Sequence, residues 1–332
     1  MNSRILGIGR HVPERVVTND DLSQMMDTTD EWIQQRTGIR ERHFVTADAG
    51  PGDLAAPAAR QALADAGIEA KDLDLVLLGS LSPDFDFPNG CSVVARHLGL
   101  RGTPVMDVRN QCSGFVYMLA VADKFIRTGG ARHVLVVGAE THSTGLDLTT
   151  TGREVAVIFG DGAAAVVMGP EPDPKKGVLT THLHSEGKYA KKLMVEVPTS
   201  VCQPRVSPEM LSGPGSRLWP RMEGRYVFKH AVTRFPEVVN EALAATGHTI
   251  DDIDLFIPHQ ANLRISQLVA MGLELPPEKM FNNIERYGNT TAASIPLALY
   301  EAREAGLVRE GALVCLAAFG AGFTWGAALI RW

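Results

Sequence analysis

Short runs of aliphatic and β-branched residues alternate along the chain with longer segments that are apolar on one or more sides. The short runs predict strands at residues 75–79, 105–108, 134–138, 155–158, 164–168, 254–257 and 313–317. The longer segments predict helices at residues 53–66, 112–128, 227–246, 261–271 and 293–305. Because strands alternate with helices, the pattern predicts a layered α/β fold.

The pattern of the first half of the chain recurs in the second half. ALADAGIEAKDLDLVLLGS at 62–80 and ALAATGHTIDDIDLFIPHQ at 242–260 each combine a helix end, a glycine, a short acidic turn and an apolar strand. The glycine-rich segments at 159–169 and 319–330 are also similar. Chance similarity between ordinary strand–helix units is the alternative explanation. The repeat predicts two α/β halves of similar construction, residues 1–170 and 171–332.

Residues 198–222 interrupt this pattern. Five prolines exclude a regular helix or strand there: Pro198, Pro204, Pro208, Pro214 and Pro220. The segment also carries Met210, Trp219 and Met222, whose apolar side chains favour a loop that covers a binding pocket. An exposed loop of variable sequence is the alternative.

Composition narrows the classes of function. Apolar residues make up 45% and charged residues 21% of the 332 residues, which is typical of a globular protein. The net charge of −6 and the absence of a Lys/Arg run argue against a nucleic-acid partner. No apolar run reaches the roughly 18–20 residues that span a bilayer, so no membrane partner is expected. The four cysteines have no CxxC spacing and no export signal precedes them, which predicts free thiols and a cytoplasmic location.

Cys112 is the strongest candidate for chemistry. It lies between the predicted strand at 105–108 and a helix that is apolar on nearly every side. A thiol at the start of a buried helix meets unpaired backbone N–H groups and the positive end of the helix dipole, both of which favour the nucleophilic thiolate. The sequence therefore predicts a nucleophile at Cys112, and an inert buried cysteine is the alternative.

His259 and Asn289 are the candidate partners of this cysteine. His259 closes the predicted strand at 254–257, at the carboxyl edge where the sites of α/β proteins gather. Asn289 lies in the loop before the helix at 293–305, 177 positions from Cys112 and so close to the repeat period. Cys112 and Asn289 are therefore predicted at equivalent corners of the two halves. Turn formation by the Gly-Asn pair is the alternative for Asn289.

Six motifs, distributed over nearly the whole chain, resemble those of one family. They are DTTDEWIQQRTGIRER at 27–42, the corner around Cys112, VIFGDGAAAVV at 157–167, PHQANLRI at 258–265, RYGNTTAASIP at 286–296 and FGAGFTWGAALIRW at 319–332. The chain resembles β-ketoacyl-acyl-carrier-protein synthase III, a condensing enzyme of the thiolase superfamily. The resemblance implies a thiolase-like, duplicated αβαβα fold of five layers, a homodimer, and a Cys-His-Asn triad that falls on Cys112, His259 and Asn289.

The resemblance implies a reaction in two steps. Cys112 attacks an acyl-CoA thioester and releases CoA, while the backbone N–H groups of Cys112 and Ala321 form the oxyanion hole. His259 and Asn289 then donate hydrogen bonds to the thioester carbonyl of malonyl-acyl-carrier protein, which loses CO₂ and condenses with the acyl-enzyme. The product is a β-ketoacyl-acyl-carrier protein, and neither a cofactor nor a metal is required.

The resemblance also implies binding positions. CoA binding falls on Trp32, Arg36, Thr37, Gly224 and Asn262. Binding of the acidic carrier protein falls on Lys229, Gln260, Ala261, Asn262, Leu263 and Arg264. The acyl pocket falls on His142 and on Phe87, contributed by the neighbouring subunit. A core anchor on a helix is the alternative for Trp32.

Four departures from the family's usual pattern leave the identity of the acyl primer open. The corner reads Arg-Asn-Gln-Cys-Ser-Gly at 109–114 in place of smaller residues. Thr151 replaces a usual arginine, with Arg153 two places further on. Met271 replaces a basic residue, and His142 replaces an aliphatic one.

Three other enzyme classes are compatible with parts of the sequence. The Gln-Cys-Ser-Gly corner is also similar to alkylquinolone-type condensing enzymes, which use the same triad on an aromatic acyl thioester. A Cys-His-Asn hydrolase of peptides or thioesters shares the triad but does not need a malonyl thioester. A degradative thiolase needs a second reactive cysteine, and Cys315 lies inside a predicted strand instead.

Overall fold

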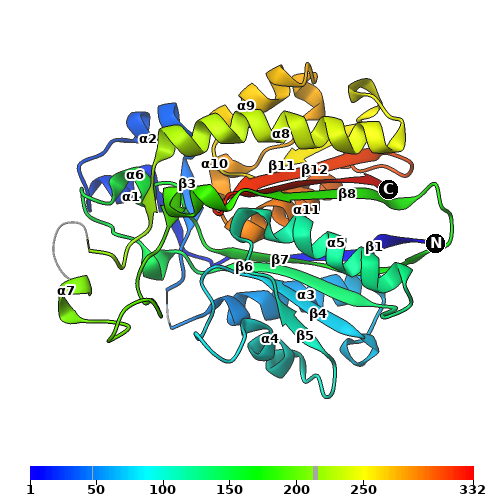
Figure 1. The fold of residues 1–332 in the computed structure, drawn as a ribbon, viewed down its shortest axis with the longest axis horizontal. Helices are drawn as coiled ribbons and strands as arrows, with labels where there is room; N and C mark the ends of the chain where they lie inside the picture. Colours follow the sequence, from blue (N-terminus) through cyan, green and yellow to red (C-terminus); the bar gives the residue numbers. More distant parts are fainter. Residues whose placement is uncertain (47, 212–215) are drawn as a thin grey trace.

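Two β-sheets lie face to face with two helices between them, and further helices cover the outer face of each sheet (Figure 1). The computed structural model describes residues 1–46, 48–211 and 216–332. In order across the molecule, the layers are helices α8 and α9, one sheet, helices α5 and α11, the other sheet, and helices α3 and α4. The arrangement is the five-layered αβαβα fold that the motifs imply.

The first sheet has five strands and draws them from residues 2–171. Their order is β1 (Asn2–His11), β7 (Gly162–Glu171), β6 (Val134–Glu140), β4 (Leu75–Gly79) and β5 (Val105–Asp107). Strands β6, β4 and β5 run parallel, whereas β7 is antiparallel to both β1 and β6. Helices α3 (Pro51–Ala66) and α4 (Gly90–Leu98) cover its outer face. Four of the predicted strands are confirmed here, and β1 is an addition.

The predicted strand at 155–158 is wrong. These residues belong to the short helix α6 (Arg153–Ala156) and the turn that follows it. The backbone N–H groups of Val155 and Ala156 both bond to the carbonyl of Gly152 and close a helical turn. The segment is apolar because it packs in a small cluster beside the main core, not because it joins a sheet.

The second sheet has four strands, drawn from residues 177–331. Their order is β11 (Leu255–Pro258), β12 (Leu313–Gly320), β13 (Thr324–Arg331) and β8 (Gly177–Ser185). Helices α8 (Gly224–Thr246) and α9 (Leu263–Gly272) cover its outer face. The predictions of β11 and β12 are confirmed, and β13 and β8 are additions. Because no comparison tests it, the division of the chain at residue 170 remains a prediction.

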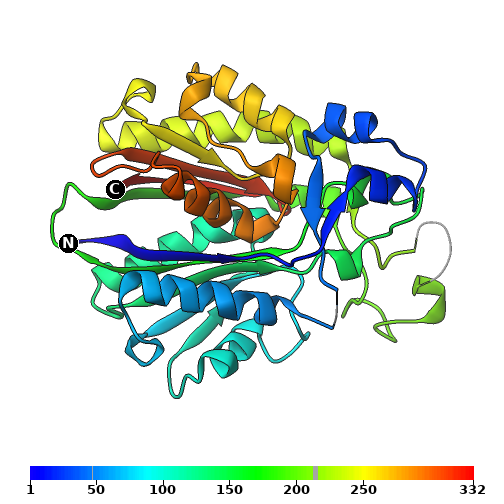
Figure 2. The same ribbon diagram turned by 180° about the vertical axis from the view of Figure 1, so that it is seen from behind.

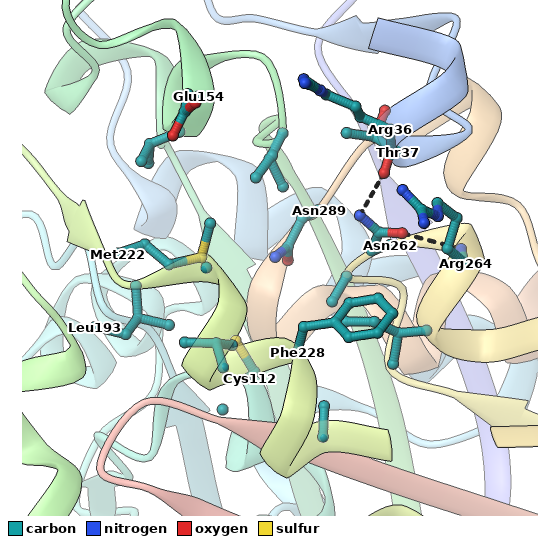
Figure 3. Close-up of a pocket in the computed structure, with 18 of the residues that line it drawn as sticks. Arg36, Thr37, Cys112, Glu154, Leu193, Met222, Phe228, Asn262, Arg264 and Asn289 are labelled. Atoms are coloured by element: carbon teal, nitrogen blue, oxygen red, sulfur yellow. Dashed lines mark hydrogen bonds between the residues drawn. The ribbon is translucent and has the colours of Figure 1, made fainter. Parts of the chain in front are cut away.

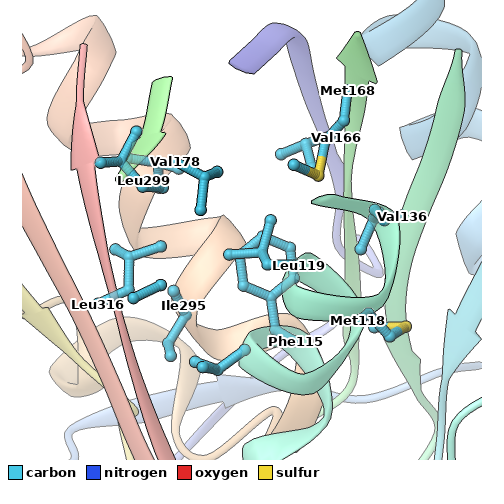
Figure 4. Close-up of a cluster of buried hydrophobic side chains, with 14 of the residues drawn as sticks. Phe115, Met118, Leu119, Val136, Val166, Met168, Val178, Ile295, Leu299 and Leu316 are labelled. Carbon is cyan, nitrogen blue, oxygen red and sulfur yellow. The ribbon is translucent and has the colours of Figure 1, made fainter. Parts of the chain in front are cut away.

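The central layer consists of helices α5 (Gly114–Arg127) and α11 (Ser294–Glu304), each preceded by a 3₁₀ turn. The turns are η2 (Gln111–Ser113) and η7 (Thr291–Ala293). Between the sheets, large side chains of both helices are nearly or completely removed from water, as Figure 4 shows: Phe115, Met118, Leu119, Ile295 and Leu299. Burial of each such side chain contributes about 1.5–3 kcal/mol. The central helices therefore fix the positions of the turns at their N-termini.

The two repeated segments fold alike. Helices α3 and α8 both end at a glycine in the left-handed conformation, Gly67 with φ 66° and Gly247 with φ 69°. A 3₁₀ turn follows in each case, η1 (Ala70–Asp72) and η5 (Ile250–Asp252), and then a buried strand, β4 or β11. The similarity between 62–80 and 242–260 therefore extends to the backbone.

Smaller elements gather at the end of the layers opposite the two termini (Figure 2). They are β2 (Val16–Thr18), α1 (Asn19–Ser23), α2 (Asp30–Thr37), β3 (Glu41–His43), η3 (Ser143–Gly145), η4 (Gly187–Lys192), β9 (Leu193–Met194), α7 (Pro208–Leu211), β10 (Arg221–Met222) and α10 (Ile284–Tyr287). The turn η6 (Pro277–Lys279) lies before α10 in the chain. In the described part of the chain, no helix is both long and apolar enough to cross a membrane.

The segment 198–222 is not wholly irregular, which corrects the prediction. Its helix α7 begins at Pro208, a position where proline is tolerated because the first N–H of a helix has no partner. Its strand β10 pairs with β9. Met210 and Trp219 are half-buried, and Met222 lines the cavity described below. Pro214 lies outside the described residues.

Candidate active site

A cavity of about 700 Å³ opens at the end of the layers where α2, α6 and α8 meet. Its wall includes Cys112, His259 and Asn289, so the structure brings the three predicted catalytic residues together. In Figure 3, Arg36, Thr37, Asn262 and Arg264 group together on one side of the cavity. Much of the remaining lining is apolar: Val155, Val157, Ile158, Phe159, Leu193, Met222, Val227, Phe228, Ala231, Phe235 and Phe319.

Cys112 is the middle residue of the turn η2, between β5 and α5. Strand β12 passes very close to Cys112. A Cβ atom added to Gly320 of this strand would lie 2.6 Å from the Cys112 Cβ and 3.1 Å from its Sγ. Only a glycine fits that position without a shift. On the other side, the Ser113 hydroxyl is 2.9 Å from the carbonyl oxygen of Thr324. The thiol is therefore held at one point of the cavity wall.

The surroundings of Cys112 do not favour the expected thiolate. Burial, with a further contribution from the nearby Glu140 carboxyl, raises the pKa of Cys112 to about 12. The backbone N–H groups of Cys112 and Ala321 act in the opposite direction, but they do not balance the loss of water. The carboxyl of Glu140 is itself buried, and its pKa is raised to about 7. These surroundings therefore favour the protonated thiol.

His259 follows strand β11 and is bonded both to strand β12 of the second sheet and to helix α11 of the central layer. Its backbone N–H donates to the carbonyl of Ala317 at 2.8 Å, and its Nδ1 lies 2.6 Å from the Oγ of Ser294. Its Nε2 is buried and has no hydrogen-bond partner among the residues that the structure describes. Burial lowers the pKa of His259 to about 3, so the ring is neutral. Sequence reasoning missed Ser294, because the contact joins residues 35 positions apart.

Asn289 takes the turn role that was the alternative to catalysis, and it also faces the cavity. Its Oδ1 accepts the backbone N–H of Thr291 at 2.8 Å, and its own N–H donates to Ile158 at 2.8 Å. Since an N–H donor occupies the oxygen end of the amide, the other end, Nδ2, is available to a substrate. Forming the turn and donating to a ligand are therefore compatible.

Two guanidinium groups lie over the indole of Trp32 at the mouth of the cavity. Arg36 is 4.2 Å and Arg153 is 5.0 Å from the ring centroid. Trp32 is half-buried: one part of it packs against a buried cluster, as the core-anchor alternative predicts, and it also lines the cavity. Arg153, two positions after Thr151, thus supplies a cation beside Trp32. The Thr37 hydroxyl is buried and donates to the carbonyl of Ile33, so it is already engaged.

The side chain of Asn262 caps helix α9. Its Oδ1 accepts the N–H of Arg264, and its Nδ2 donates to the carbonyl of Arg36, which joins α9 to α2. Ala261 and Gly224 line the cavity beside it. Leu263 is half-buried and packs against Gly38.

Gln260 does not reach the surface, which corrects its predicted contact with the carrier protein. Its side chain is buried, donates to the carbonyl of Pro258 at 2.7 Å and accepts the N–H of Asn283 at 3.0 Å. It fixes the loop after β11 instead. Lys229 is exposed on α8, outside the cavity lining.

The two predicted acyl-pocket residues do not line the cavity of this chain. Phe87 is 82% exposed. His142 is buried behind the wall, with its ring 4.5 Å from that of Phe159. Their roles remain predictions. Among the described residues, no cluster of His, Cys, Asp or Glu is arranged to hold a metal ion.

Comparison with known proteins decides the family. The model of 3-oxoacyl-[acyl-carrier-protein] synthase III matches residues 106–187, and its C-terminal model matches residues 243–332. A β-ketoacyl-[acyl-carrier-protein] synthase III from Xanthomonas euvesicatoria pv. vesicatoria is 48% identical over 99% of this chain and 98% of the relative. The chain belongs to the β-ketoacyl-[acyl-carrier-protein] synthase III family.

Other members of the β-ketoacyl-[acyl-carrier-protein] synthase III family agree with this assignment. A member from Bradyrhizobium diazoefficiens is 46% identical over 100% of this chain and 99% of the relative. The crystal structure of a member from Aquifex aeolicus VF5 superposes with a TM-score of 0.90 and 40% identity, covering 99% of this chain and 100% of that one. These similarities confirm two predictions from the sequence: the thiolase-like fold, and the assignment to the condensing acyltransferases of fatty acid biosynthesis. The alkylquinolone-type, hydrolase and degradative thiolase alternatives are not favoured.

Proposed function

We propose that this enzyme condenses an acyl-CoA primer with malonyl-acyl-carrier protein, through an acyl group carried on Cys112. The observation that supports the proposal most is the convergence of Cys112, His259 and Asn289 on one cavity. The overall reaction forms β-ketoacyl-carrier protein, CO₂ and CoA. Cysteine thiolate, imidazole and amide supply all the chemistry, so no cofactor is required.

In the first half-reaction, Cys112 exchanges its proton for the acyl group. The surroundings of Cys112 favour the protonated thiol, so its proton leaves as the sulfur attacks the thioester carbonyl. The departing CoA thiolate takes up that proton, so that thiol and acyl-CoA give acyl-enzyme and free CoA. The N–H groups of Cys112 and Ala321, which already favour the thiolate, also stabilise the oxyanion that forms.

In the second half-reaction, His259 and Asn289 act as neutral hydrogen-bond donors. The Ser294 hydroxyl accepts the N–H of Gln260, so its own hydrogen can point at Nδ1 of His259. That arrangement places the ring hydrogen on Nε2, toward the cavity. Together with Nδ2 of Asn289, it stabilises the charge that develops on the thioester oxygen as CO₂ leaves.

Charge at the cavity mouth suits both substrates. Arg36 and Arg153 flank Trp32, so a planar base can stack there while its phosphates meet cations. Arg264 lines the mouth and Lys229 is exposed on the adjoining helix α8, which is complementary to an acidic carrier protein. Gln260 takes no part in that surface.

A homodimer is part of the proposal. Strand β5 ends the first sheet, so one of its edges pairs with no other strand of the described residues. Phe85 and Phe87 are 56% and 82% exposed in the segment between β4 and α4, and Met106 of β5 is 40% exposed. A second copy would cover these side chains and bring Phe87 toward the partner's acyl pocket. All four cysteines are free, in keeping with the proposed cytoplasmic location.

A two-step assay tests the proposal. Labelled acyl-CoA is added first and should leave a stable label on the protein. Malonyl-acyl-carrier protein is added next and should remove the label as β-ketoacyl-carrier protein, with one CO₂ released per acyl group. Release of free acid without malonyl-acyl-carrier protein would instead identify a thioester hydrolase. A panel of acyl-CoAs in the same assay identifies the primer.

A further inference from the structure

Thr291 has an unfavourable backbone conformation for a β-branched residue. Its φ of 51° lies in the left-handed region, where glycine is common and threonine is rare. The residue is buried and begins the turn η7, two positions after Asn289. Such a conformation persists only where neighbouring groups enforce it.

Two buried hydrogen bonds enforce the conformation of Thr291. Its backbone N–H donates to Oδ1 of Asn289 at 2.8 Å. Its hydroxyl lies 2.7 Å from Nε2 of His142, a residue of the other half of the chain. Because the first bond determines which end of the Asn289 amide faces the cavity, the direction of that amide depends on the conformation of Thr291.

His142 is fixed independently of Thr291. The next residue, Ser143, donates its backbone N–H to the buried carboxyl of Asp161 at 2.8 Å, and the His142 ring lies 4.5 Å from that of Phe159. Burial lowers the pKa of His142 to about 3, so its ring carries no charge beside His259. The imidazole is therefore a rigid, neutral partner for the Thr291 hydroxyl.

We propose that His142 is a positioning residue for Asn289, acting through the Thr291 hydroxyl. The imidazole holds Thr291 in its left-handed turn, and the turn directs Nδ2 of Asn289 into the cavity. His142 does not line the cavity, so this role requires no contact with substrate. The inference rests on the proposed function of Asn289 as a donor to the malonyl thioester.

The test compares His142→Leu in the wild-type and in the Thr291→Gly background. Leucine cannot bond the hydroxyl, so kcat for release of CO₂ from malonyl-acyl-carrier protein should decrease about two- to tenfold, the range for one neutral hydrogen bond. The rate of Cys112 acylation and KM for malonyl-acyl-carrier protein should not change. Glycine adopts the left-handed conformation without strain, so in the Thr291→Gly background the same substitution should have almost no effect.

Two further variants keep the test decisive if Thr291→Gly is inactive. Thr291→Val removes only the hydroxyl, so it should reproduce the loss of His142→Leu without adding to it. His142→Gln keeps a polar group within reach and should recover part of the rate. Gln111→Gly, at the left-handed residue of the other central turn, is the matched control and should not rescue His142→Leu.

Three results would overturn the proposal. Equal losses in both backgrounds, or an equal loss of acylation, would reduce His142 to a packing residue. A changed acyl-CoA preference with unchanged CO₂ release would assign it to the acyl pocket. A wild-type enzyme that releases no CO₂ from malonyl-acyl-carrier protein would overturn the proposed function, which distinguishes that failure from the other two.

Discussion

The two turns that precede the central helices share a backbone conformation and differ in chemistry. Turn η2 begins at Gln111 with φ 39°, and turn η7 begins at Thr291 with φ 51°. Both residues are left-handed without being glycine, and they are 180 positions apart. The second residue of η2 is Cys112, and the second residue of η7 is Ala292. The structural equivalent of the nucleophile is therefore an alanine, and Asn289 lies just before it, at the equivalent corner of the other half.

Packing explains this difference. A Cβ atom on Gly138 would lie 2.4 Å from the carbonyl oxygen of Ala292, and one on Gly79 would lie 3.2 Å from its Cβ. Strands β6 and β4 therefore pass close to the buried Ala292, and the polar side chains of this corner come from the flanking residues. Asn289 lies before the turn, and Ser294 after it holds His259. Under the proposed function, one corner would carry the acyl group and the other would direct hydrogen-bond donors.

The largest effect is expected when the nucleophile at the corner of turn η2 is replaced. Cys112→Ser should carry no acyl label from labelled acyl-CoA, because a serine hydroxyl is a far weaker nucleophile than a thiol. Cys202→Ser, at the half-buried cysteine of the 198–222 segment, is the matched control and should be labelled normally. If Cys112→Ser retained label at the wild-type level, Cys112 would not be the residue that carries the acyl group.

Asn289→Asp tests the opposite corner. The carboxylate keeps an oxygen for the Thr291 N–H but cannot donate to the substrate, so CO₂ release should decrease about 10²–10³-fold. Acylation of Cys112 should be affected much less. Asn282→Asp, outside the cavity lining, serves as the control. If acylation and CO₂ release decrease equally, the two corners do not divide the reaction.

The rate at which Cys112 is alkylated in the absence of substrate, measured as a function of pH, tests the protonation state of the thiol. With a pKa of about 12, the thiolate fraction should increase about tenfold per pH unit from pH 7 to pH 9. The rate of alkylation by iodoacetamide should follow it, since the thiolate is the nucleophile. His259, with a pKa of about 3, remains neutral over this range and adds no inflection. A plateau below pH 8 would show that the thiolate is already formed before substrate binds.

The smallest effect concerns the close approach of β12 to Cys112. Gly320→Ala places a methyl group against the Cys112 side chain, so it should slow acylation about tenfold and cost about 1–3 kcal/mol of folding free energy. Gly145→Ala, where a Cβ meets nothing within 4 Å, is the control for both measurements. Thermal unfolding and the labelling rate measure the two effects. Normal labelling of Gly320→Ala would show that this contact does not position the thiol.

Much of the fold could be predicted from the sequence, and the missed strands show why some could not. Strand β13 is buried but carries small residues such as Gly326, where a Cβ would lie 2.7 Å from the carbonyl oxygen of His182. Close packing of two strands leaves no β-branched signal there. Strand β8 is an edge strand and is largely half-buried, so it lacks an apolar run. Conversely, the apolar residues at 155–158 pack in a cluster beside the main core, and Val155, Val157 and Ile158 also line the cavity.

The sequence predicted the site residues that lie in recognisable motifs. It did not predict the features of the site that depend on contacts between residues far apart in the sequence. The positions of Cys112, His259 and Asn289 follow strands or precede helices that the pattern predicts. Ser294 acts through a residue 35 positions away, and sequence spacing carries no sign of that contact. The protonated state of Cys112 depends on burial and on Glu140, neither of which a helix N-terminus reveals.

Release of CO₂ by Cys112→Ala tests most directly whether the two corners act separately. This variant cannot be acylated, but His259, Asn289 and Ser294 remain in place. Given malonyl-acyl-carrier protein labelled in its free carboxyl group, Cys112→Ala should still release labelled CO₂, and the double variant with Asn289→Asp should not. A Cys112→Ala enzyme that releases no CO₂, although folded as shown by an unchanged melting temperature, would contradict the separation of the two corners.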